Sequence, residues 1–524
     1  MTGLLRRTAA AGGTLLSAAL LLAALAPPAS ASTDAARADA ASAELDWGAC
    51  PAPTPNADGT PFPRDPRQQC ARLRVPRDYR HPGAGTITLT VSRIRTADPA
   101  HRRGDLVVVP GGPGGPGLDY PGQAATFLPP AVLHSYDLIG FDERGVGNST
   151  PVHCDLPADE RTALLNYPYP APDGSITANL AHAKAVADRC AAGAGPYLAD
   201  ITTANSARDL DRIRTALGVR RISYLGTSYA TYLGQVYASL FPARADHVVL
   251  DSTVAPGGEQ QGIALFSEGA EDTFPDLAAY AAARDATLHL GATPGAVRAA
   301  YLRLAAELDR APLDLGDGRT LTGAGLRAVT YSSLSSPRYY PLAVAAWQLA
   351  ATRGTTPPAT GPAHGSLPRV IPDNFVSAQD AVVCDDSSWP RDPAVYAARV
   401  AADRERYPLT DGMSGNVQPC AFWHYRPHEP QVRPNPEGPR DILLLQNRRD
   451  PATPYSGARR TLTAFGPRAA MVTLDAAGHG VDFTDPRVSV PLTSFLLTNR
   501  LPDRLPDRLP DRLPDRSPGA PAGP

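Results

Sequence analysis

A serine stands at the centre of the stretch GTSYA, where Ser228 follows a short apolar run and precedes a helical pattern. Its hydroxyl becomes a nucleophile at neutral pH only when a base takes its proton and a third group orients that base. Small residues two positions before and after the serine let a strand and a helix meet in a strained turn that exposes the hydroxyl. Here these residues are Gly226 and Ala230, one methyl group away from the usual two glycines. The stretch predicts a nucleophile on a strand-to-helix turn, against the alternative of a buried hydroxyl.

An aspartate and a histidine follow the serine in the order that such a turn requires. Asp450 lies in LLLQNRRDPATP and His479 in LDAAGHGVD, each directly after an apolar run. Taken singly, Asp450 could be a cap and His479 a turn residue, but their order and placement relative to Ser228 predict a Ser-His-Asp triad. Two further acids, Asp475 and Asp482, lie beside the histidine, and Asp482 is kept as the alternative acid.

Acyl transfer also needs hydrogen-bond donors for the negative oxygen of the tetrahedral intermediate. The backbone N–H of Tyr229, directly after the nucleophile, is one expected donor. The second is expected from the loop PGGPGGPG at 110–117, where Gly111 and Gly112 let backbone amides point into the site. A phosphate-binding loop is the competing interpretation, but the Lys-Ser/Thr ending is absent and the GxGxxG spacing is not met.

Strands and helices alternate along the parts of the chain that carry these residues, which predicts a mostly parallel sheet with function at the carboxyl ends of its strands. Ser206 is the expected N-cap of one helix, with Asp209 in its first turn. The expected strands are 71–75, 86–94, 106–109, 136–141, 222–225, 247–250, 441–445 and 469–474, and the expected helices include 206–217, 274–286, 294–308 and 488–497.

The first residues are typical of an export signal. Arg6 and Arg7 precede the apolar run 15–26, and the AxA site at 29–31 predicts cleavage near Ser32. Secretion follows, by the general or the twin-arginine route. An uncleaved membrane anchor is disfavoured because the apolar run is shorter than the roughly 20 residues of a membrane span.

The strand pattern divides the rest of the chain. We expect a signal peptide at 1–31, a first core part at 32–254, a helical cap inserted at 255–436, a second core part at 437–499, and a disordered LPDR-repeat tail at 500–524, where a proline at every fourth position forbids a regular helix. The proline-rich segment 51–69 also suggests disorder.

Composition narrows the classes of function. The 524 residues carry a net charge of −2 with mixed signs, which argues against a nucleic-acid partner or a basic membrane-binding face. In an exported chain the six cysteines are candidates for disulfides, and of 15 possible connectivities the simplest joins neighbours: Cys50 with Cys70, Cys154 with Cys190, and Cys384 with Cys420. No CxxC or Cys/His cluster indicates a metal, and serine chemistry needs no cofactor.

The joint set of motifs resembles a known family. VVVPGGPGGPG, FDERGVGNS, YLGTSYATYLGQVYASLFP, VVLDSTVAP, AVVCDDSSW, CAFWHYRP, LLLQNRRDPATP and AAGHG together resemble the secreted tripeptidyl aminopeptidases of the proline iminopeptidase-related branch of the α/β-hydrolase superfamily, from about 46 to 497. The resemblance implies an α/β-hydrolase fold with Ser228 as nucleophile, Asp450 as acid and His479 as base. Glycines 111–112 with Tyr229 would form the oxyanion hole. Besides Ala230, Pro110 departs from the pattern, because the corresponding loop of proline iminopeptidases begins with histidine.

The family's activity implies peptide substrates with a free N-terminus, whose ammonium group a carboxylate in the cap can hold. The candidates are Glu259, Glu268, Glu271, Asp272, Asp385 and Asp386, with Glu259, Glu268 and Glu271 preferred. For each of them a solvated helix charge is the alternative.

The sequence thus predicts a secreted, monomeric serine exopeptidase that releases short peptides, with tripeptides favoured by the resemblance. A carboxylesterase or lipase with the same triad, a prolyl aminopeptidase, and a non-catalytic binding protein on the same scaffold are the alternatives. The number of residues released per cut and the side-chain preference stay open.

Overall fold

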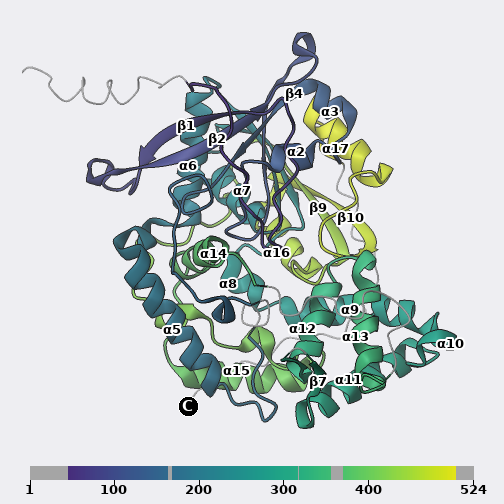
Figure 1. The fold of residues 1–524 in the computed structure, drawn as a ribbon. Coiled ribbons are helices and arrows are strands. Elements are labelled where there is room, and N and C mark those ends of the chain that lie inside the picture. The colour runs from purple at the N-terminus through teal and green to yellow at the C-terminus, as the bar shows by residue number, and fades with distance from the viewer. Residues whose placement is uncertain (1–44, 163–167, 317, 356–369, 503–524) are drawn as a thin grey trace, which may run out of the picture. The chain divides into compact units, whose positions relative to one another are not determined.

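The computed structural model describes residues 45–162, 168–316, 318–355 and 370–502, so the predicted signal peptide and the tail from residue 503 onward lie outside it. Its main sheet has eight strands in the order β1-β2-β4-β3-β5-β6-β9-β10. Figure 1 shows β1 and β2 on one side of this sheet and β9 and β10 on the other. The strands are β1 (Gln69–Pro76), β2 (Thr86–Ile94), β3 (Gly104–Val109), β4 (Tyr136–Phe141), β5 (Ile222–Thr227), β6 (Ala245–Asp251), β9 (Ile442–Arg449) and β10 (Ala469–Ala477). All pairs from β4 to β10 are parallel, and only β1 and β2 are antiparallel to their neighbours. The predicted, mostly parallel sheet is confirmed.

Both faces of the central strands are buried, because successive side chains point to opposite faces and both sets are apolar. In β3, Val107 and Val109 join one core, which also holds apolar residues of the helices after β5 and before it. Leu106 and Val108 join the other core, which includes Phe495 near the end of the described chain. This explains why the sequences of central strands, such as VVV at 107–109 and LLL at 443–445, are continuous apolar runs.

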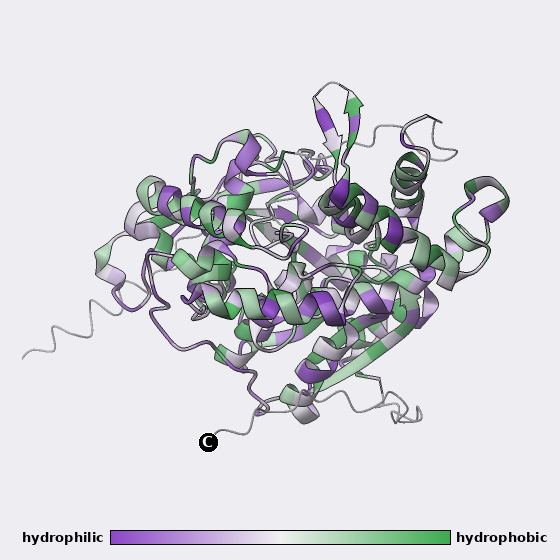
Figure 2. Ribbon diagram, turned by 90° about the horizontal axis from the view of Figure 1, so that it is seen from below, coloured by the Kyte–Doolittle hydropathy of each residue, from purple (hydrophilic) through white to green (hydrophobic). Residues whose placement is uncertain are grey.

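Helices cover the two faces and carry hydrophobic and hydrophilic residues in neighbouring bands (Figure 2). Those of the sheet region are α2 (Tyr120–Ala124), α3 (Pro130–Ser135), α6 (Thr203–Ala216), α7 (Tyr229–Leu240), α16 (Tyr455–Phe465) and α17 (Pro486–Thr498). α5 (Thr177–Ala194) lies away from the sheet and packs against the 3-10 turn at Pro419–Phe422 (Figure 1). α7 packs against α6 and against β5 and β6, while α17 packs against α3 and the last two strands. The helix that follows Ser228 is therefore held between the sheet and α6.

Between β6 and β9 the described chain adds no strand to the main sheet. It forms α8 (Gly258–Ile263), α9 (Phe266–Ala282), α10 (Asp285–Leu288), α11 (Pro294–Arg310), α12 (Gly323–Ser333), α13 (Tyr340–Ala351), α14 (Asp373–Asp385), α15 (Pro393–Arg406) and a hairpin of β7 (Leu313–Gly316) with β8 (Arg319–Leu321). We call this region the cap. α9, α11, α12 and α13 share a separate core in which Phe274, Tyr301 and Trp347 contact one another. Among the described residues, no helix has the length and apolar character needed to cross a membrane.

Three sequence expectations need correction. α6 begins at Thr203, because the hydroxyl of Thr202 accepts the N–H of Asn205, and Ser206 lies inside the helix rather than at its cap. α9 begins at Phe266, eight residues before the expected start, and continues through its proline to residue 282.

The third correction concerns the segment 51–69, which is described and anchored although its composition suggests disorder. Arg64 donates two hydrogen bonds to the carboxylate of Asp119, and Gln68 donates to the same carboxylate. Partners distant in sequence hold this segment, and they leave no local pattern.

Three disulfides join neighbouring cysteines, in the pairing that the sequence favoured as simplest. Cys50–Cys70 ties the start of the described chain to β1, and Cys154–Cys190 ties the loop after β4 to α5. Cys384–Cys420 joins the end of α14 to the 3-10 turn at Pro419–Phe422 within the cap. All three bonds therefore close local loops.

A buried ion pair joins the loop after β4 to α6. The guanidinium of Arg144, three residues after the end of β4, donates two hydrogen bonds of 2.8 Å to Asp209 on α6, and both side chains are fully buried. Arg144→Met is expected to lower the free energy of unfolding by about 3–5 kcal/mol, because it leaves a buried carboxylate without its cation. Urea unfolding measures this change. The exposed pair of Lys184 with Asp188 is the control, and Lys184→Met should cost less than about 1 kcal/mol; equal effects would contradict the prediction.

Candidate active site

Ser228 occupies the turn between β5 and α7 with φ 61° and ψ −129°, a conformation that residues with a β-carbon rarely adopt. Its N–H donates to the backbone carbonyl of Asp251 at 2.9 Å, which fixes the turn against the next strand. A β-carbon on Gly226 would lie 2.6 Å from the carbonyl oxygen of Ala230, so only glycine fits there. Ala230 itself is fully buried, and its methyl group is accommodated. The strained strand-to-helix turn is present despite the departure from glycine.

The carboxylate of Asp450 faces the histidine. Both of its oxygens lie 3.0 Å from Nδ1 of His479, and the aspartate is 1% exposed. The backbone N–H groups of Ala452 and Thr453 and the hydroxyl of Thr453 donate to it at 2.9 Å each. These donors hold the carboxylate in one orientation, and the carboxylate favours the tautomer of His479 with a proton on Nδ1.

Two opposing effects act on the pKa of His479. Burial lowers it, but the charge of Asp450 and the hydrogen bond to it raise it above the ordinary histidine value, with smaller contributions from Asp251 and Glu259. The ring is therefore ready to accept a proton.

The glycines on both sides of His479 set the backbone conformation of its loop. Gly478 has φ 119° and Gly480 φ 87°, and the N–H of His479 donates to the carbonyl of Ser335 in the cap. Of the alternative acids, Asp475 is exposed and paired with Arg449, while Asp482 is bound to the N–H and hydroxyl of Thr484. Neither one is bound to the histidine ring.

The glycine loop lies directly against the nucleophile. A β-carbon on Gly111 would lie 2.5 Å from Cβ of Ser228, so any side chain there would collide with the serine. Gly112, with φ 139°, lines the same cavity as Ser228. Tyr229 is the first residue of α7, where backbone N–H groups have no partner within the helix. The expected donor residues therefore surround the serine.

A cavity of about 280 Å³ opens beside Ser228 and His479. It is lined by Gly112, Ser228, Val254, Glu259, Gly262, Phe266, Tyr331, Ser332, Ser335, Pro451, Ala452, Thr453 and His479. Core loops supply one wall, and cap residues from α8 to α12 supply the other. Phe266 and Tyr331 contact each other, and together with Val254 they make part of the lining apolar. Residues of the cap thus line the cavity beside Ser228 and His479.

Of the three preferred acids, the structure brings only Glu259 into this cavity. Glu259 is 9% exposed, and burial raises its pKa to about 8; the charge of Asp386 adds to this effect and that of His479 opposes it. Glu271 is bound by the guanidinium of Arg298, and Glu268 is not among the lining residues. The spacing of acids along helices could not separate these cases, because it does not show which helix face meets the core.

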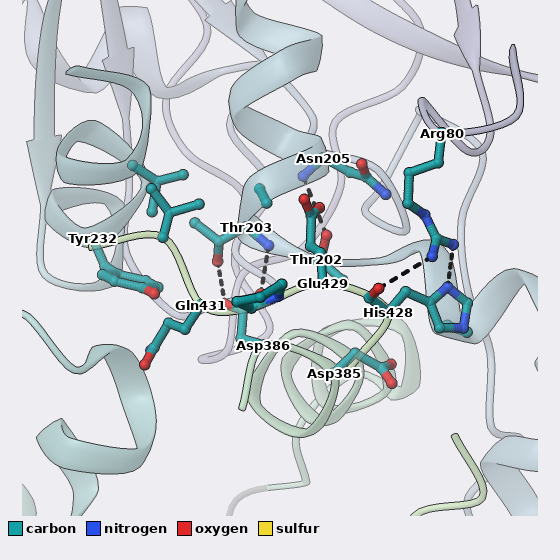
Figure 3. Close-up of a pocket in the computed structure, with 15 residues that line it drawn as sticks. Arg80, Thr202, Thr203, Asn205, Tyr232, Asp385, Asp386, His428, Glu429 and Gln431 are labelled. Carbon is teal, nitrogen blue, oxygen red and sulfur yellow. Dashed lines mark hydrogen bonds between the residues drawn. The ribbon is translucent and has the colours of Figure 1, made fainter. Parts of the chain in front are cut away.

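Asp385 and Asp386 line a small second pocket that Figure 3 shows in close-up. Asp386 accepts the N–H and hydroxyl of Thr203, and Asp385 accepts the indole N–H of Trp423. The residue before Glu259, Gly258, is so close to Tyr232 and Gln431 of that pocket that a β-carbon on it would lie 2.8 Å from either side chain. Glu259 therefore lines the cavity at Ser228, while the residue before it lies close to side chains of the second pocket.

The chain is similar to known proteins over most of its length. Residues 407–508 match a family model described as TAP-like protein. A tripeptidyl aminopeptidase of Streptomyces lividans is 32% identical over 488 residues, which cover 89% of this chain and 86% of that protein.

The chain belongs to the tripeptidyl aminopeptidase family. Serine protease Hip1 of Mycobacterium tuberculosis is 30% identical over 83% of this chain and 86% of its own length. A protein of the same organism named carboxylesterase B is 29% identical over 79% and 81%, respectively. Membership of the tripeptidyl aminopeptidase family and the sheet order together confirm the predicted α/β-hydrolase fold and the expectation that the chain is an enzyme of the serine hydrolase class.

In this member of the tripeptidyl aminopeptidase family, Thr453 is a site residue that the sequence reasoning missed. Its hydroxyl donates to Asp450, lies 3.4 Å from Nδ1 of His479, and its residue lines the cavity. An aspartate followed by threonine three positions later is a common local hydrogen-bonding motif. The sequence DPAT therefore contained the signal.

Proposed function

We propose that this enzyme is a secreted, monomeric serine exopeptidase that releases short peptides, tripeptides above all, from free N-termini. The observation that carries this proposal is the buried carboxylate of Glu259 in the cavity that also holds Ser228 and His479. The relatives named tripeptidyl aminopeptidase support it, and the predicted signal at 1–31 with three disulfides supports secretion.

The proposed reaction follows from the arrangement of the groups. Nδ1 of His479 is engaged by Asp450, so Nε2 takes the proton of Ser228 as the hydroxyl attacks the substrate carbonyl. Backbone donors of Tyr229 and of the glycines 111–112 stabilise the oxyanion. His479 then protonates the leaving amine, and water, activated by the same imidazole, hydrolyses the acyl-enzyme.

Recognition of the substrate ammonium is proposed for Glu259. A buried carboxylate is unstable in its charged form unless a cation pairs with it, and the lining of the cavity offers no arginine or lysine. The ammonium of a bound peptide supplies that cation and restores the charged form. The charge of Asp386 also raises the pKa of Glu259, so a cation bound at Glu259 is attracted by both acids. A free N-terminus then sets the distance from Glu259 to the bond that Ser228 attacks.

Glu259→Gln tests this role. We expect kcat/KM for a tripeptide anilide with a free amino group to fall roughly a hundredfold, about 2.7 kcal/mol, because the amide keeps the shape of the carboxylate but not its charge. The N-acetylated anilide and a short-chain ester are measured beside it. Wild type should prefer the free amine over its acetylated twin by a similar factor, and the variant should lose that preference while its ester hydrolysis is unchanged.

Glu271→Gln is the matched control, since it removes an acid of the same cap whose partner is Arg298. It should leave all three rates within about twofold of wild type. If acetylation makes no difference to wild type and the ester is fastest, the exopeptidase proposal is wrong.

A carboxylesterase with the same triad is the second candidate, because a relative bears the name carboxylesterase B and Phe266, Tyr331 and Val254 give the cavity an apolar side. The substrate comparison above decides between the two. A proline anilide added to the series tests the prolyl aminopeptidase alternative, which requires efficient cleavage after a single residue.

A further inference from the structure

Asp251, the last residue of β6, is a buried acid that the triad does not use. It is 1% exposed and pairs in register with Thr227, the residue before the nucleophile. Its backbone carbonyl accepts the N–H of Ser228 at 2.9 Å, and Oδ2 accepts the hydroxyl of Thr227 at 3.3 Å. One residue thus holds both the nucleophile and its predecessor.

The other oxygen of the same carboxyl group reaches the histidine loop. Oδ1 of Asp251 accepts the N–H of Val481 at 3.0 Å, two residues after His479. The next residue, Ser252, accepts the N–H of Gly480 at 2.7 Å and has φ 57°, a conformation rare outside glycine. Two consecutive side chains therefore bind two consecutive amides directly after the histidine, and strained backbone at the strand end makes this possible.

We propose that Asp251 is a positioning residue, whose carboxyl group ties the nucleophile turn to the histidine loop and whose negative charge stabilises the histidine when it is protonated. The proposal rests on the proposed role of His479 as base, and it is independent of the exopeptidase specificity. Nothing in the spacing of the sequence required it, because the carboxyl group acts between two loops more than 200 residues apart in the chain.

The charges around the site agree with this role. Burial raises the pKa of Asp251 to about 7; the N–H of Val481, the charge of His479 and the hydroxyl of Thr227 lower it, and the charge of Asp450 raises it. The charge of Asp251 in turn raises the pKa of His479, as do the charges of Asp450 and Glu259. It also raises the pKa of Tyr120, and the hydroxyl of Tyr120 lies 3.4 Å from the hydroxyl of Thr227. Above about pH 7 the imidazolium therefore faces a second carboxylate besides Asp450.

Asp251→Asn separates charge from hydrogen bonding, because the amide oxygen still accepts from Val481 and the amide NH2 can donate to Thr227. We expect kcat for p-nitrophenyl acetate to fall about tenfold with KM nearly unchanged, because the lost negative charge no longer stabilises the histidine that becomes protonated as the serine attacks. The acid limb of the profile of kcat/KM against pH should move down by about one unit, because the lost anion no longer favours the imidazolium. Asp251→Ala, which loses both effects, should fall about a hundredfold.

Inactivation by a fluorophosphonate probe is measured in parallel and should slow by the same factors. Asp105→Asn is the control. Asp105 is a buried acid near the start of β3, whereas the glycine loop follows the end of that strand, and it is paired with Arg102. Its replacement should leave kcat and the acid limb unchanged. Should Asp251→Asn not fold, Thr227→Val replaces it. Loss of that hydroxyl raises the pKa of Asp251, so the acid limb moves in the same direction by a smaller amount.

A folded Asp251→Asn protein with wild-type kcat and an unmoved acid limb would overturn the proposal. A second result would also overturn it: a lower kcat with an unmoved acid limb, accompanied by a lower melting temperature and a proportional loss of titratable serine. A purely structural role of Asp251 produces that result. Failure of the proposed triad gives a different result, because Ser228→Ala would then retain ester hydrolysis. Failure of the exopeptidase specificity alone would change the substrate comparison and leave the expected effects of Asp251→Asn on the ester as they are.

Discussion

Ser228→Ala is expected to lower kcat by about a millionfold on every substrate, because removing a triad nucleophile costs about as much as removing the whole triad. The fold should be unchanged. The hydrogen bond from residue 228 to Asp251 uses the backbone N–H, and alanine brings the same β-carbon into the same strained turn. The measurement is kcat on the tripeptide anilide and on the ester, with melting temperature as the check on folding.

The control for this variant is Ser239→Ala on the same helix, where the hydroxyl donates to the carbonyl of Gln235. It should retain wild-type kcat. Residual activity of Ser228→Ala above about a thousandth of wild type would exclude Ser228 as the nucleophile.

Asp450→Asn is expected to lower kcat about ten-thousandfold, while KM changes little. The side-chain oxygen of asparagine still accepts the N–H groups of Ala452 and Thr453, so the loop keeps its shape. The amide NH2 then faces Nδ1 of His479, which imposes the tautomer whose Nε2 carries the proton and cannot act as a base.

The acid that the sequence kept as an alternative provides the control. Asp482→Asn should leave kcat within about twofold of wild type, because Asp482 is bound to Thr484 rather than to the histidine. If the two variants exchanged their effects, the assignment of Asp450 would be wrong.

The features that could be predicted from the sequence are those that depend on residues close together in the chain or on the order of the strands. Apolar runs such as 106–109 and 442–445 mark strands buried on both faces, and the order of Ser228, Asp450 and His479 follows from the order in which a parallel sheet is built. Neighbouring cysteines were paired for a similar reason, since each pair closes a short loop.

What the sequence could not show depends on contacts between distant segments. Glu259 and Glu271 both lie on cap helices, and only the packing of those helices puts one into the cavity and the other against Arg298. The segment 51–69 lacks any periodic pattern, and Arg64 orders it through a residue of another loop. Asp251 reads as the ordinary end of a strand until the histidine loop is placed beside it.

The order of the strands also sets when this enzyme can become active. β9 and β10 pair beyond β6 at one edge of the sheet, so they dock only after the whole cap has been synthesised. A growing chain therefore presents Ser228 long before it possesses Asp450 and His479, and closing so long a loop is a slow step. The nascent polypeptide carries a nucleophile without a base. Under the proposed function, a cell that makes this hydrolase is thus protected from it for most of its synthesis by the order of the strands alone.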